Sequence, residues 1–336
     1  MDTAYTPPFT MTPEITKLVI HIGELIGHLT ATTANIPSPK LRKQNRIKTI
    51  QSSLAIENNS LSIEQVTAIL EGKRVLGSPN EIQEVKNAID AYELLLELNP
   101  YKEKDLLRAH RLMMHNLVHE NGRYRSGGVG VIGQEGLVHL APPANRVPML
   151  MGQLMEWVKK SQEHPLVRSC VFHYEFEFIH PFADGNGRMG RMWQTLLLMQ
   201  WNPIFAWIPV ESIVKDNQQQ YYDAIAQSDH QGNSTPFIRF MLQSISLTLE
   251  EIKQNQQHEA ATEGSTLKST PKSTLKGTPK CIYEIMSDNP TITINELSER
   301  LALNRRGIVK HIQNLQSQGL IRRIGPAKGG HWEVIK

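Results

Sequence analysis

The sequence predicts a mainly α-helical protein in which one β-hairpin interrupts the helices and a small separate domain follows. Three observations predict this class. Apolar residues recur at helical spacing in long segments of residues 1 to about 260. A glycine-rich stretch between Gly127 and Pro143 holds two short β-prone runs. A repeat rich in Ser, Thr, Pro and Lys then separates this body from a compact segment that begins near residue 281.

The composition is that of a globular protein with room for a sizeable core. The chain has 336 residues, 40% of them hydrophobic and 21% charged, which suits about two domains at roughly 150 residues each. No apolar stretch approaches the ~18 residues that a membrane span requires, and the start lacks the features of a secretory signal. Cys170 and Cys281 form no disulfide framework. We therefore expect a protein of the reducing cytoplasm, without membrane contact.

Four segments of the body show the helical periodicity most clearly. In each of them apolar residues return every three or four positions, so that one face of a helix would be buried. The predicted helices are Ile15–Thr30, Glu81–Leu98, Lys104–His119 and Val147–Lys160.

The glycine-rich interruption predicts a hairpin. Its strands are expected at Val129–Ile132 and Leu137–Leu140, joined by the loop Gly133–Gly136. An isolated two-stranded hairpin leaves backbone groups unpaired at its edges. The segment is therefore either a docking edge for an extended peptide or an ordinary surface hairpin.

A linker is predicted at 261–280, because the repeat Ser265–Lys280 contains prolines and hydroxyl residues that cannot build a core. An acceptor of modification or a nucleic-acid contact is the alternative interpretation. The repeat carries four lysines and no acidic residue, so a basic tail follows a mildly acidic body. The body itself divides at about residue 110, into an N-terminal helical region (1–110) and a core (111–260).

The segment 281–336 resembles a winged helix-turn-helix domain. Helical patterns at Asn295–Leu301 and Asn304–Ser317 precede strand-like runs at Leu320–Ile324 and His331–Ile335. In a DNA complex, residues between 304 and 328 would face the groove. They are Asn304, Arg305, Arg306, Lys310 and, on the wing, Lys328. Such domains also serve protein contacts alone, and the sequence leaves both open.

The chemistry is concentrated in twelve residues, from His180 to Arg191. Apolar helical segments flank this stretch, so it joins two buried elements. Pro181 forces His180 out of helical geometry, and two glycines, Gly185 and Gly187, permit close backbone approach. Successive N–H groups at the mouth of a helix form an anion site.

The side chains of this stretch suit a bound triphosphate. Arg188 and Arg191 project to one side of the helix and can clamp phosphate oxygens. Asp184 offers the hard oxygen ligand that Mg²⁺ prefers. His180 has the pKa range needed to take a proton from an attacking hydroxyl. A capped turn with solvated charges would not explain this convergence.

These residues match the signature of the Fic family, H-P-F-x-D-G-N-G-R-x-x-R, at every specified position, and the resemblance spans roughly residues 10 to 250. Fic proteins are helical domains with a β-hairpin flap, and most transfer AMP from ATP to a Ser, Thr or Tyr hydroxyl. The resemblance implies the same fold and activity here, with ATP as co-substrate and Mg²⁺ as cofactor. It also implies a protein target, self-modification and a homodimer.

The resemblance assigns a role to each site residue. His180 is the general base, Asp184 holds Mg²⁺ between the α- and β-phosphates, and Asn186 steadies the α-phosphate. The remaining phosphate contacts fall to Gly185, Gly187 and Arg188, with Arg191 on the γ-phosphate. The strand Leu137–Leu140 resembles the flap that aligns the target chain by strand addition, and Val138 and His139 on it are expected to contact ATP. Tyr221, Tyr222 and Asp229 lie where the family contacts the nucleotide; core packing is the alternative for one of the tyrosines.

A second resemblance concerns the segment from Ser53 to Asn58, which is similar to the family's inhibitory motif. Ser53 and Glu57 are four residues apart and share one helix face. In this interpretation Glu57 pairs with Arg191 and occupies the place of the γ-phosphate. A bound ATP is then misaligned, and a misplacement of about 1 Å can cost on the order of 100-fold in rate.

Other functions compete with AMP transfer. Some Fic proteins with the inhibitory glutamate remove AMP, and others transfer different phosphate-containing groups. A DNA-binding regulator with a Fic sensor body is the rival from another class. A zinc site at His115 and His119, with Glu120 adjacent and His110 upstream, is disfavoured, because the order is not H-E-x-x-H and no third ligand is evident.

Overall fold

The structure, a computed structural model, divides into two units, residues 1–256 and 257–336. It describes residues 5–32, 39–133 and 136–263 of the chain. In the C-terminal unit it describes 282–283, 285–287, 289–290, 292–300, 308, 311–312, 315–316, 320–324 and 331–334. Each unit is described by itself.

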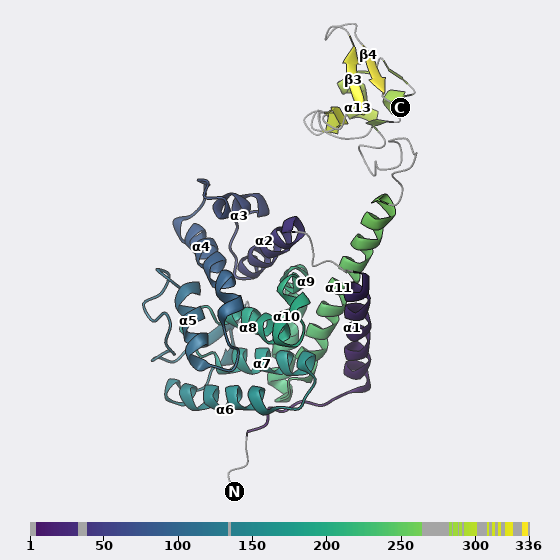
Figure 1. The fold of residues 1–336 in the computed structure, drawn as a ribbon. Helices are drawn as coiled ribbons and strands as arrows, with labels where there is room; N and C mark the ends of the chain where they lie inside the picture. The colour runs from purple at the N-terminus through teal and green to yellow at the C-terminus, as the bar shows by residue number, and fades with distance from the viewer. Residues whose placement is uncertain are drawn as a thin grey trace. The chain divides into compact units, whose positions relative to one another are not determined.

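The first unit is an assembly of helices (Figure 1), and its described residues also form a two-stranded sheet. In the described residues before the hairpin, the helices are α1 (Pro13–Thr32), α2 (Pro39–Ile56), α3 (Ile63–Leu70), α4 (Pro79–Glu93), the 3₁₀ turn η1 (Leu94–Glu97) and α5 (Glu103–Met113). After the hairpin come η2 (Ala144–Arg146), α6 (Val147–Lys160), α7 (Pro165–Ile179), α8 (Asn186–Trp201), η3 (Pro203–Ala206), α9 (Val210–Asp216), α10 (Gln218–Gln231) and α11 (Thr235–Glu263). None of the helices in the described ranges is both long enough and apolar enough to cross a bilayer.

Local sequence sets many of the helix ends. Pro79 and Pro165 stand at the first positions of α4 and α7, where the missing N–H costs nothing. Ser62 and Gln65 form a reciprocal capping box at the start of α3. The prediction for Val147–Lys160 is confirmed in both bounds.

Two predicted helices were too long. The expected Lys104–His119 helix ends at Met113, and Asn116 then takes a positive φ of 58°, which a continuing helix does not allow. The expected Glu81–Leu98 helix changes to the 3₁₀ turn η1 after Glu93, shortly before Pro100. Apolar periodicity persisted beyond both true ends, which explains the error.

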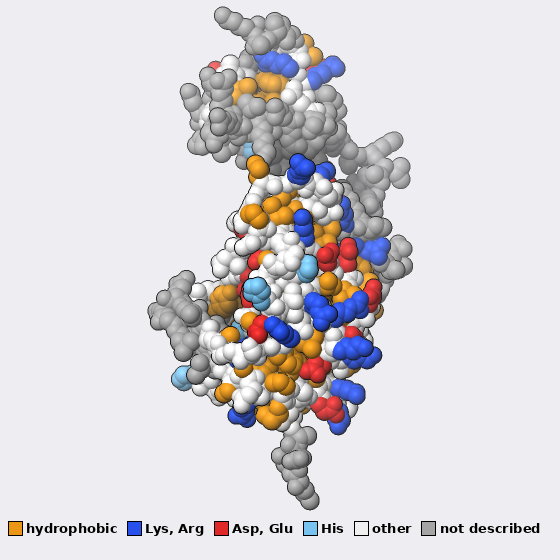
Figure 2. Space-filling model, turned by 90° about the vertical axis from the view of Figure 1, so that its left-hand side faces the viewer, with side chains coloured by type: hydrophobic (Ala, Val, Ile, Leu, Met, Phe, Trp, Pro, Cys, Tyr) orange, Lys and Arg blue, Asp and Glu red, His pale blue; other side chains and the backbone are white. Residues whose placement is uncertain are grey.

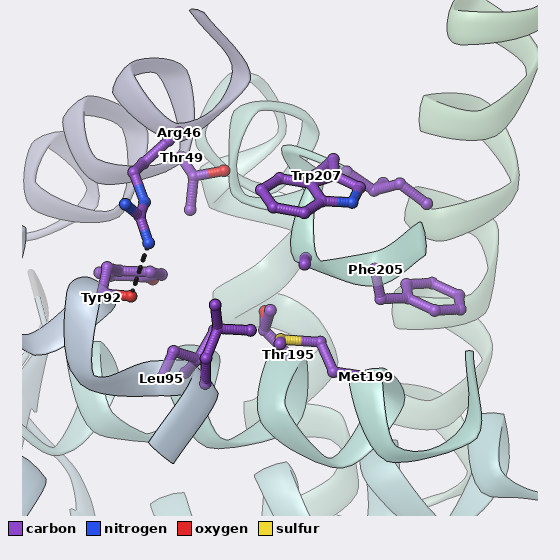
Figure 3. A pocket seen from close by; sticks show the side chains of 11 residues that line it. Arg46, Thr49, Tyr92, Leu95, Thr195, Met199, Phe205 and Trp207 are labelled. Atoms are coloured by element: carbon purple, nitrogen blue, oxygen red, sulfur yellow. Dashed lines mark hydrogen bonds between the residues drawn. The ribbon is translucent and has the colours of Figure 1, made fainter. Parts of the chain in front are cut away.

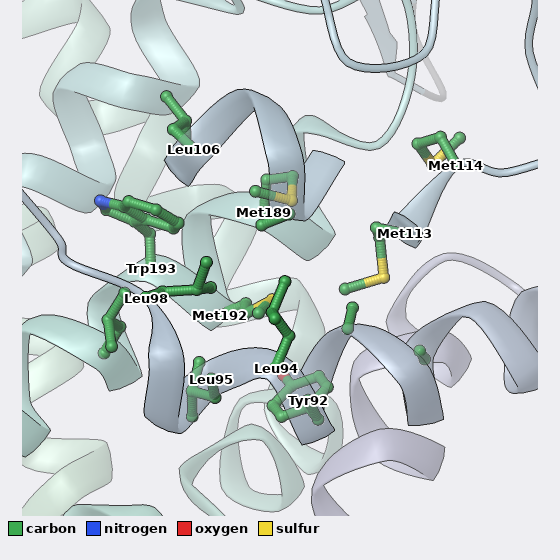
Figure 4. Packing of buried hydrophobic residues seen from close by; sticks show 14 of the residues in the cluster. Tyr92, Leu94, Leu95, Leu98, Leu106, Met113, Met114, Met189, Met192 and Trp193 are labelled. Carbon is green, nitrogen blue, oxygen red and sulfur yellow. The ribbon is translucent and has the colours of Figure 1, made fainter. Parts of the chain in front are cut away.

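The helices α7 and α8 form the centre of the body. Phe172 and Trp193 belong to a core cluster with α2 to α6, whereas Val171 and Leu198 belong to a second cluster with α1 and α9 to α11. Figure 4 shows Trp193 of α8 in the first of these clusters, together with Leu94 and Leu95 of η1 and Leu106 of α5. Each such buried side chain stabilises the fold by about 1.5–3 kcal/mol. The turn between α7 and α8 is therefore held between two well-packed elements.

The predicted hairpin is confirmed. Strands β1 (Gly130–Gly133) and β2 (Gly136–Leu140) pair antiparallel, with Gly133 opposite Gly136. An irregularity in register lies between Val131 and Ile132, which is typical of a β-bulge.

The C-terminal unit contains α13 (Ile294–Arg300) and the antiparallel strands β3 (Ile321–Ile324) and β4 (His331–Val334). Its own apolar core includes Ile282, Leu297, Ile308, Leu315 and Trp332. The elements agree with the predicted winged helix-turn-helix order. The proposed groove residues Asn304, Arg305, Arg306, Lys310 and Lys328 lie outside the described residues, as does Cys281. Helix α11 continues to Glu263, slightly beyond the predicted start of the linker at 261.

Candidate active site

The turn between α7 and α8 places His180 at the end of a buried helix. His180 has φ 49° and ψ 62°, a left-handed conformation that is uncommon for a residue other than glycine. Pro181 follows and excludes a helical residue before it, as the sequence predicted. Gly185 has φ 85° and allows α8 to begin at Asn186. Two left-handed residues therefore redirect the chain within one short turn.

The side chain of Asn186 closes this turn. Its Oδ1 accepts from the Phe182 N–H, and its Nδ2 donates to the Phe182 carbonyl, both at 2.9 Å. Asn186 is only 2% exposed. The resemblance gives this amide a contact with the α-phosphate; in the structure its hydrogen bonds hold the turn in shape.

His110 of α5 packs against the turn and bonds to it. Its ring stacks on Phe182 with centroids 3.6 Å apart and planes 4° from parallel. Since the Gly122 N–H donates to His110 Nδ1 at 2.9 Å, the proton lies on Nε2, which donates to the Asp184 carbonyl at 3.0 Å. Burial lowers the pKa of His110 to about 4, so the ring is neutral. Both nitrogens are thus engaged in positioning the turn.

The ring of His180 is partly accessible. Its side chain is 21% exposed, and its Nδ1 lies 3.2 Å from the Glu177 carbonyl oxygen and 4.0 Å from Glu177 Oε2. An Nδ1–H bonded to this carbonyl leaves Nε2 as the basic nitrogen. This is the tautomer that a general base at this position requires.

Two arginines stand on the first turns of α8. Arg188 is 4% exposed and lies 3.2 Å from Asp184 and 3.4 Å from Glu84. Arg191 is 3% exposed. The sequence correctly places both beside the glycine-rich turn, but Glu84 of α4, a distant partner of Arg188, gave no signal.

Glu57 meets Arg191 directly. Arg191 Nη2 lies 2.7 Å from Glu57 Oε1, and the same guanidinium donates to the Ser53 hydroxyl at 3.2 Å and to the Ser53 carbonyl at 3.0 Å. Burial acts to lower the pKa of Arg191, but the attraction of the surrounding groups, led by the Glu57 carboxylate, together outweighs burial and raises that pKa. A Cβ at Gly187 would stand 2.4 Å from Glu57 Oε1. The Glu57 carboxylate therefore rests against the first turn of α8, where an anion is favoured.

Helix α2, which ends directly before Glu57, is held in place by polar contacts. Asn45 Nδ2 donates to the Trp207 carbonyl and Arg46 donates to the Tyr92 carbonyl, each at 2.9 Å. Figure 3 shows Arg46 and Thr49 of α2 facing a small pocket lined also by Tyr92, Trp207 and Thr195. Just beyond the helix, Asn58 takes φ 68° and ends it.

The other predicted nucleotide contacts divide into three groups. Tyr221 is 2% exposed and lies 3.2 Å from His173 Nε2, so it packs in the core, whereas Tyr222 is 44% exposed. Asp229 accepts a hydrogen bond from the Tyr174 hydroxyl at 2.8 Å. Val138 and His139 lie on β2, but their side chains are outside the described part of the chain.

Asp184 is the residue that fits a magnesium ion. Its side chain is 57% exposed at the mouth of the turn, and only Oδ1 is used by Arg188 and by the Gly185 N–H. Mg²⁺ is usually bound through one or two carboxylates, waters and substrate phosphates, so a single exposed aspartate beside an anion cradle suits it. Within the described ranges, no three His, Cys, Asp or Glu side chains converge as a protein-only metal site would require.

Sequence reasoning missed several residues that shape the site. His110 and Glu84 come from α5 and α4, and Met114 packs against Gly185, where a Cβ would meet its sulfur at 2.6 Å. Arg125, which precedes the hairpin, also had no predicted role. Its contacts are described below. None of these residues is within fifty positions of the signature, so only the fold reveals them.

Comparisons with known proteins agree with this geometry. Residues 100–198 match the sequence model of the Fic/DOC family, and residues 280–322 match that of winged helix-turn-helix DNA-binding domains. The protein adenylyltransferases Fic of Aedes aegypti and Culex quinquefasciatus are 30% and 32% identical over 227 and 222 residues, which is 64% and 63% of this chain. The chain covers less than half of those relatives, 43% and 42% of their length.

Solved structures extend the likeness to the whole chain. A Fic family protein from Desulfovibrio desulfuricans G20 is 44% identical, with a TM-score of 0.73 and 98% of both chains covered. Fic-1 from C. elegans, at 21% identity and a TM-score of 0.59 over 73% of this chain, shares the fold. With the signature turn formed as described and a relative of this identity matched from end to end, the chain belongs to the Fic family.

Proposed function

We propose that the protein transfers AMP from ATP to a hydroxyl group of a protein. The observation that carries the proposal is the turn of His180 to Arg191: a basic imidazole stands beside a helix mouth that holds two buried arginines. Relatives named protein adenylyltransferase Fic support the same activity. The exposed Asp184 and the anion-binding first turn of α8 favour a magnesium-bound triphosphate as donor.

The chain's own residues account for the steps of such a transfer. The hydroxyl oxygen bonds to the α-phosphorus, the bond from phosphorus to the bridging oxygen breaks, and pyrophosphate leaves. His180 Nε2 accepts the hydroxyl proton, because Nδ1 faces the Glu177 carbonyl. The backbone around Gly187, with Arg188 and Arg191, holds the phosphates and stabilises the charge that develops on them. A magnesium ion held by Asp184 would supply further charge neutralisation.

We also propose that Glu57 restrains this activity. Its carboxylate is bonded to Arg191 and stands over Gly187, so it competes for the groups that would bind a γ-phosphate. The hairpin Gly130–Leu140 is proposed to dock the target chain, since its edge offers unpaired backbone groups.

One labelling experiment tests the reaction and its restraint. The Glu57→Gly variant, incubated with MgATP, should incorporate label from α-³²P-ATP into protein at ten-fold or more the wild-type rate. His180→Ala in the same background should abolish incorporation. Label from γ-³²P-ATP instead would indicate a kinase and contradict AMP transfer. Loss of label from a pre-modified protein, rather than gain, would identify the removal of AMP. Equal rates for the wild type and Glu57→Gly would contradict the restraint alone.

DNA binding by the C-terminal unit is a second proposal. The match of residues 280–322 to winged helix-turn-helix DNA-binding domains supports it, together with the order α13, β3, β4. In this proposal the basic residues between 304 and 328 contact the DNA.

A further inference from the structure

Arg125 lies between the hairpin and the catalytic turn. It follows the loop after α5, and its side chain is nearly inaccessible, with the residue 3% exposed. Nε donates to the His180 carbonyl at 2.7 Å, and Nη2 reaches the Ile179 carbonyl at 3.3 Å. The Arg125 backbone N–H donates to the Pro181 carbonyl at 3.0 Å. Three consecutive carbonyls of the turn are thus bonded to one residue.

The same guanidinium also donates hydrogen bonds to the two segments that flank the hairpin. Nη1 donates to the Gly127 carbonyl at 2.9 Å, and Nη2 donates to the Pro142 carbonyl at 2.5 Å. Gly127 precedes β1 and Pro142 follows β2, so the two arms of the hairpin are joined across the arginine. Both arms are therefore tied to the carbonyls of His180 and Ile179 through one planar group.

The acceptors explain why an arginine is needed. All are backbone carbonyls, and no carboxylate within the described ranges forms an ion pair with Arg125. The carbonyls of Ile179 and His180 end helix α7, where partial negative charge collects and a cation is favoured. A guanidinium has five N–H donors in a fixed fork and can serve several directions at once, whereas the ammonium of lysine is a single point.

We infer that Arg125 is a positioning residue that fixes the orientation of His180 and, through the same guanidinium, the placement of the hairpin that docks the target. This inference rests on the proposed function for the role of His180 as base and of the hairpin as docking strand. It predicts that the two are coupled: disturbing the guanidinium loosens both together.

The phosphate cradle is held separately. Asn186 bonds the Phe182 backbone, and His110 bonds the Asp184 carbonyl. Arg188 is paired with Glu84 and Asp184, and none of these contacts involves Arg125. The inference therefore separates nucleotide binding, which should survive a change at Arg125, from proton transfer and target docking, which should not.

The test uses Arg125→Lys, which keeps the charge but loses the fork, in the Glu57→Gly background. We expect kcat to fall by about 10- to 100-fold, since small misplacements of a reacting group have effects of this size. The KM for a protein or peptide target should rise, and the Kd of MgATP, measured by calorimetry, should stay within two-fold. Arg123→Lys is the matched control, because Arg123 is two residues away and its side chain is 64% exposed. It should leave all three quantities unchanged.

Two measurements do not depend on catalysis. In ¹⁵N-histidine spectra, with His180 assigned by His180→Ala, the Arg125→Lys variant should lose the single-tautomer signature of His180. Amide hydrogen exchange in 130–133 and 136–140 should accelerate in the same variant. If both occur without any AMP transfer by the parent protein, the proposed function fails and the structural coupling stands.

Three outcomes would overturn the inference. One is that the Arg125→Lys variant shows the same His180 signal and the same amide exchange rates in the hairpin as the wild type. Another is a loss of kcat that accompanies an equal loss of MgATP affinity, which would indicate general damage to the turn. The third concerns Arg125→Ala: millimolar guanidinium should restore part of its lost activity, and failure of the ion to restore any of it would contradict the assignment.

Discussion

The carboxyl group of Glu211 is buried close to Arg191. It is 3% exposed, and its Oε1 lies 3.3 Å from the Tyr92 hydroxyl and 3.4 Å from the Thr195 hydroxyl. Its Oε2 has no hydrogen-bond partner within the described part of the chain. Burial raises the pKa of Glu211 from 4.5 to about 7, although the nearby charge of Arg191 opposes this rise.

This shift makes stability depend on pH with a definite sign. The folded protein holds a proton on Glu211 that the unfolded chain releases, so stability falls as pH rises from about 4.5 to about 7. Glu211→Gln removes this dependence. Between pH 4.5 and pH 8, the free energy of unfolding of the variant, measured in urea, should rise by on the order of 1–3 kcal/mol relative to that of the wild type. Parallel pH profiles for the two proteins would contradict it.

For individual residues, a role can be predicted from the sequence where the interacting residues are neighbours in the chain. Asp184 to Arg191 could be interpreted in advance, because the chemistry and the geometry lie within one turn and one helix. The pairing of Glu57 with Arg191 was also expected, and the 2.7 Å contact agrees with it. Arg125 and Glu211 could not be foreseen, because an isolated arginine or glutamate in a sequence is most often solvated, and only packing removes the water.

Besides its hydrogen bonds, the turn between α7 and α8 is anchored in the hydrophobic core by the ring of Phe182. Phe182 is fully buried, stacks on His110 and lies 6.0 Å from Phe176. Since the ring and the Asn186 amide bond belong to the same turn, removing the ring should disturb both stability and the phosphate cradle.

Phe182→Ala should therefore lower the free energy of unfolding by about 3–5 kcal/mol, as for other buried phenylalanines. The expected loss appears in urea titration, together with weaker MgATP binding in calorimetry. Phe178→Ala, four residues earlier on α7 and 39% exposed in the native protein, is the control and should cost well under half as much. Similar losses for both variants would mean that Phe182 does not anchor the turn.

Element types were predicted better than element ends. Alternation and glycine spacing predicted the hairpin within one residue, because turn chemistry is local. The excess length predicted for the helix Lys104–His119 arose because Leu117 and Val118 continue the apolar spacing beyond Met113. Helix ends depend on which backbone groups find other partners, and here Asn87 of α4 bonds the carbonyls of Met113 and His115.

At the scale of the molecule, charge is distributed differently in the two units. On the face drawn in Figure 2, basic and acidic side chains are interspersed over the body. The basic excess belongs to the segment after residue 264. The order of domains could be predicted from composition alone, since the repeat at 265–280 cannot form a core. The proposed contact with nucleic acid belongs to this basic segment.

A gel-shift series tests that contact. The full chain should bind duplex DNA with an affinity that falls steeply as salt rises, with a slope set by the number of phosphates neutralised. Arg305→Ala combined with Arg306→Ala should weaken binding by ten-fold or more, whereas Arg168→Ala on α7 of the body serves as the control. Unchanged binding in the double variant, or no binding at low salt, would assign the unit to protein contacts.

The absence of a side chain at Gly187 bears on the proposed restraint by Glu57. A methyl group there would strike the Glu57 carboxylate at 2.4 Å and the Arg191 guanidinium at 3.0 Å. Such a methyl group would displace the Glu57 carboxylate and would also narrow the proposed nucleotide site. If Glu57 restrains AMP transfer as proposed, substitutions that activate without loss of ATP binding are expected in Glu57 or in the α2 residues that support it, and not at Gly187.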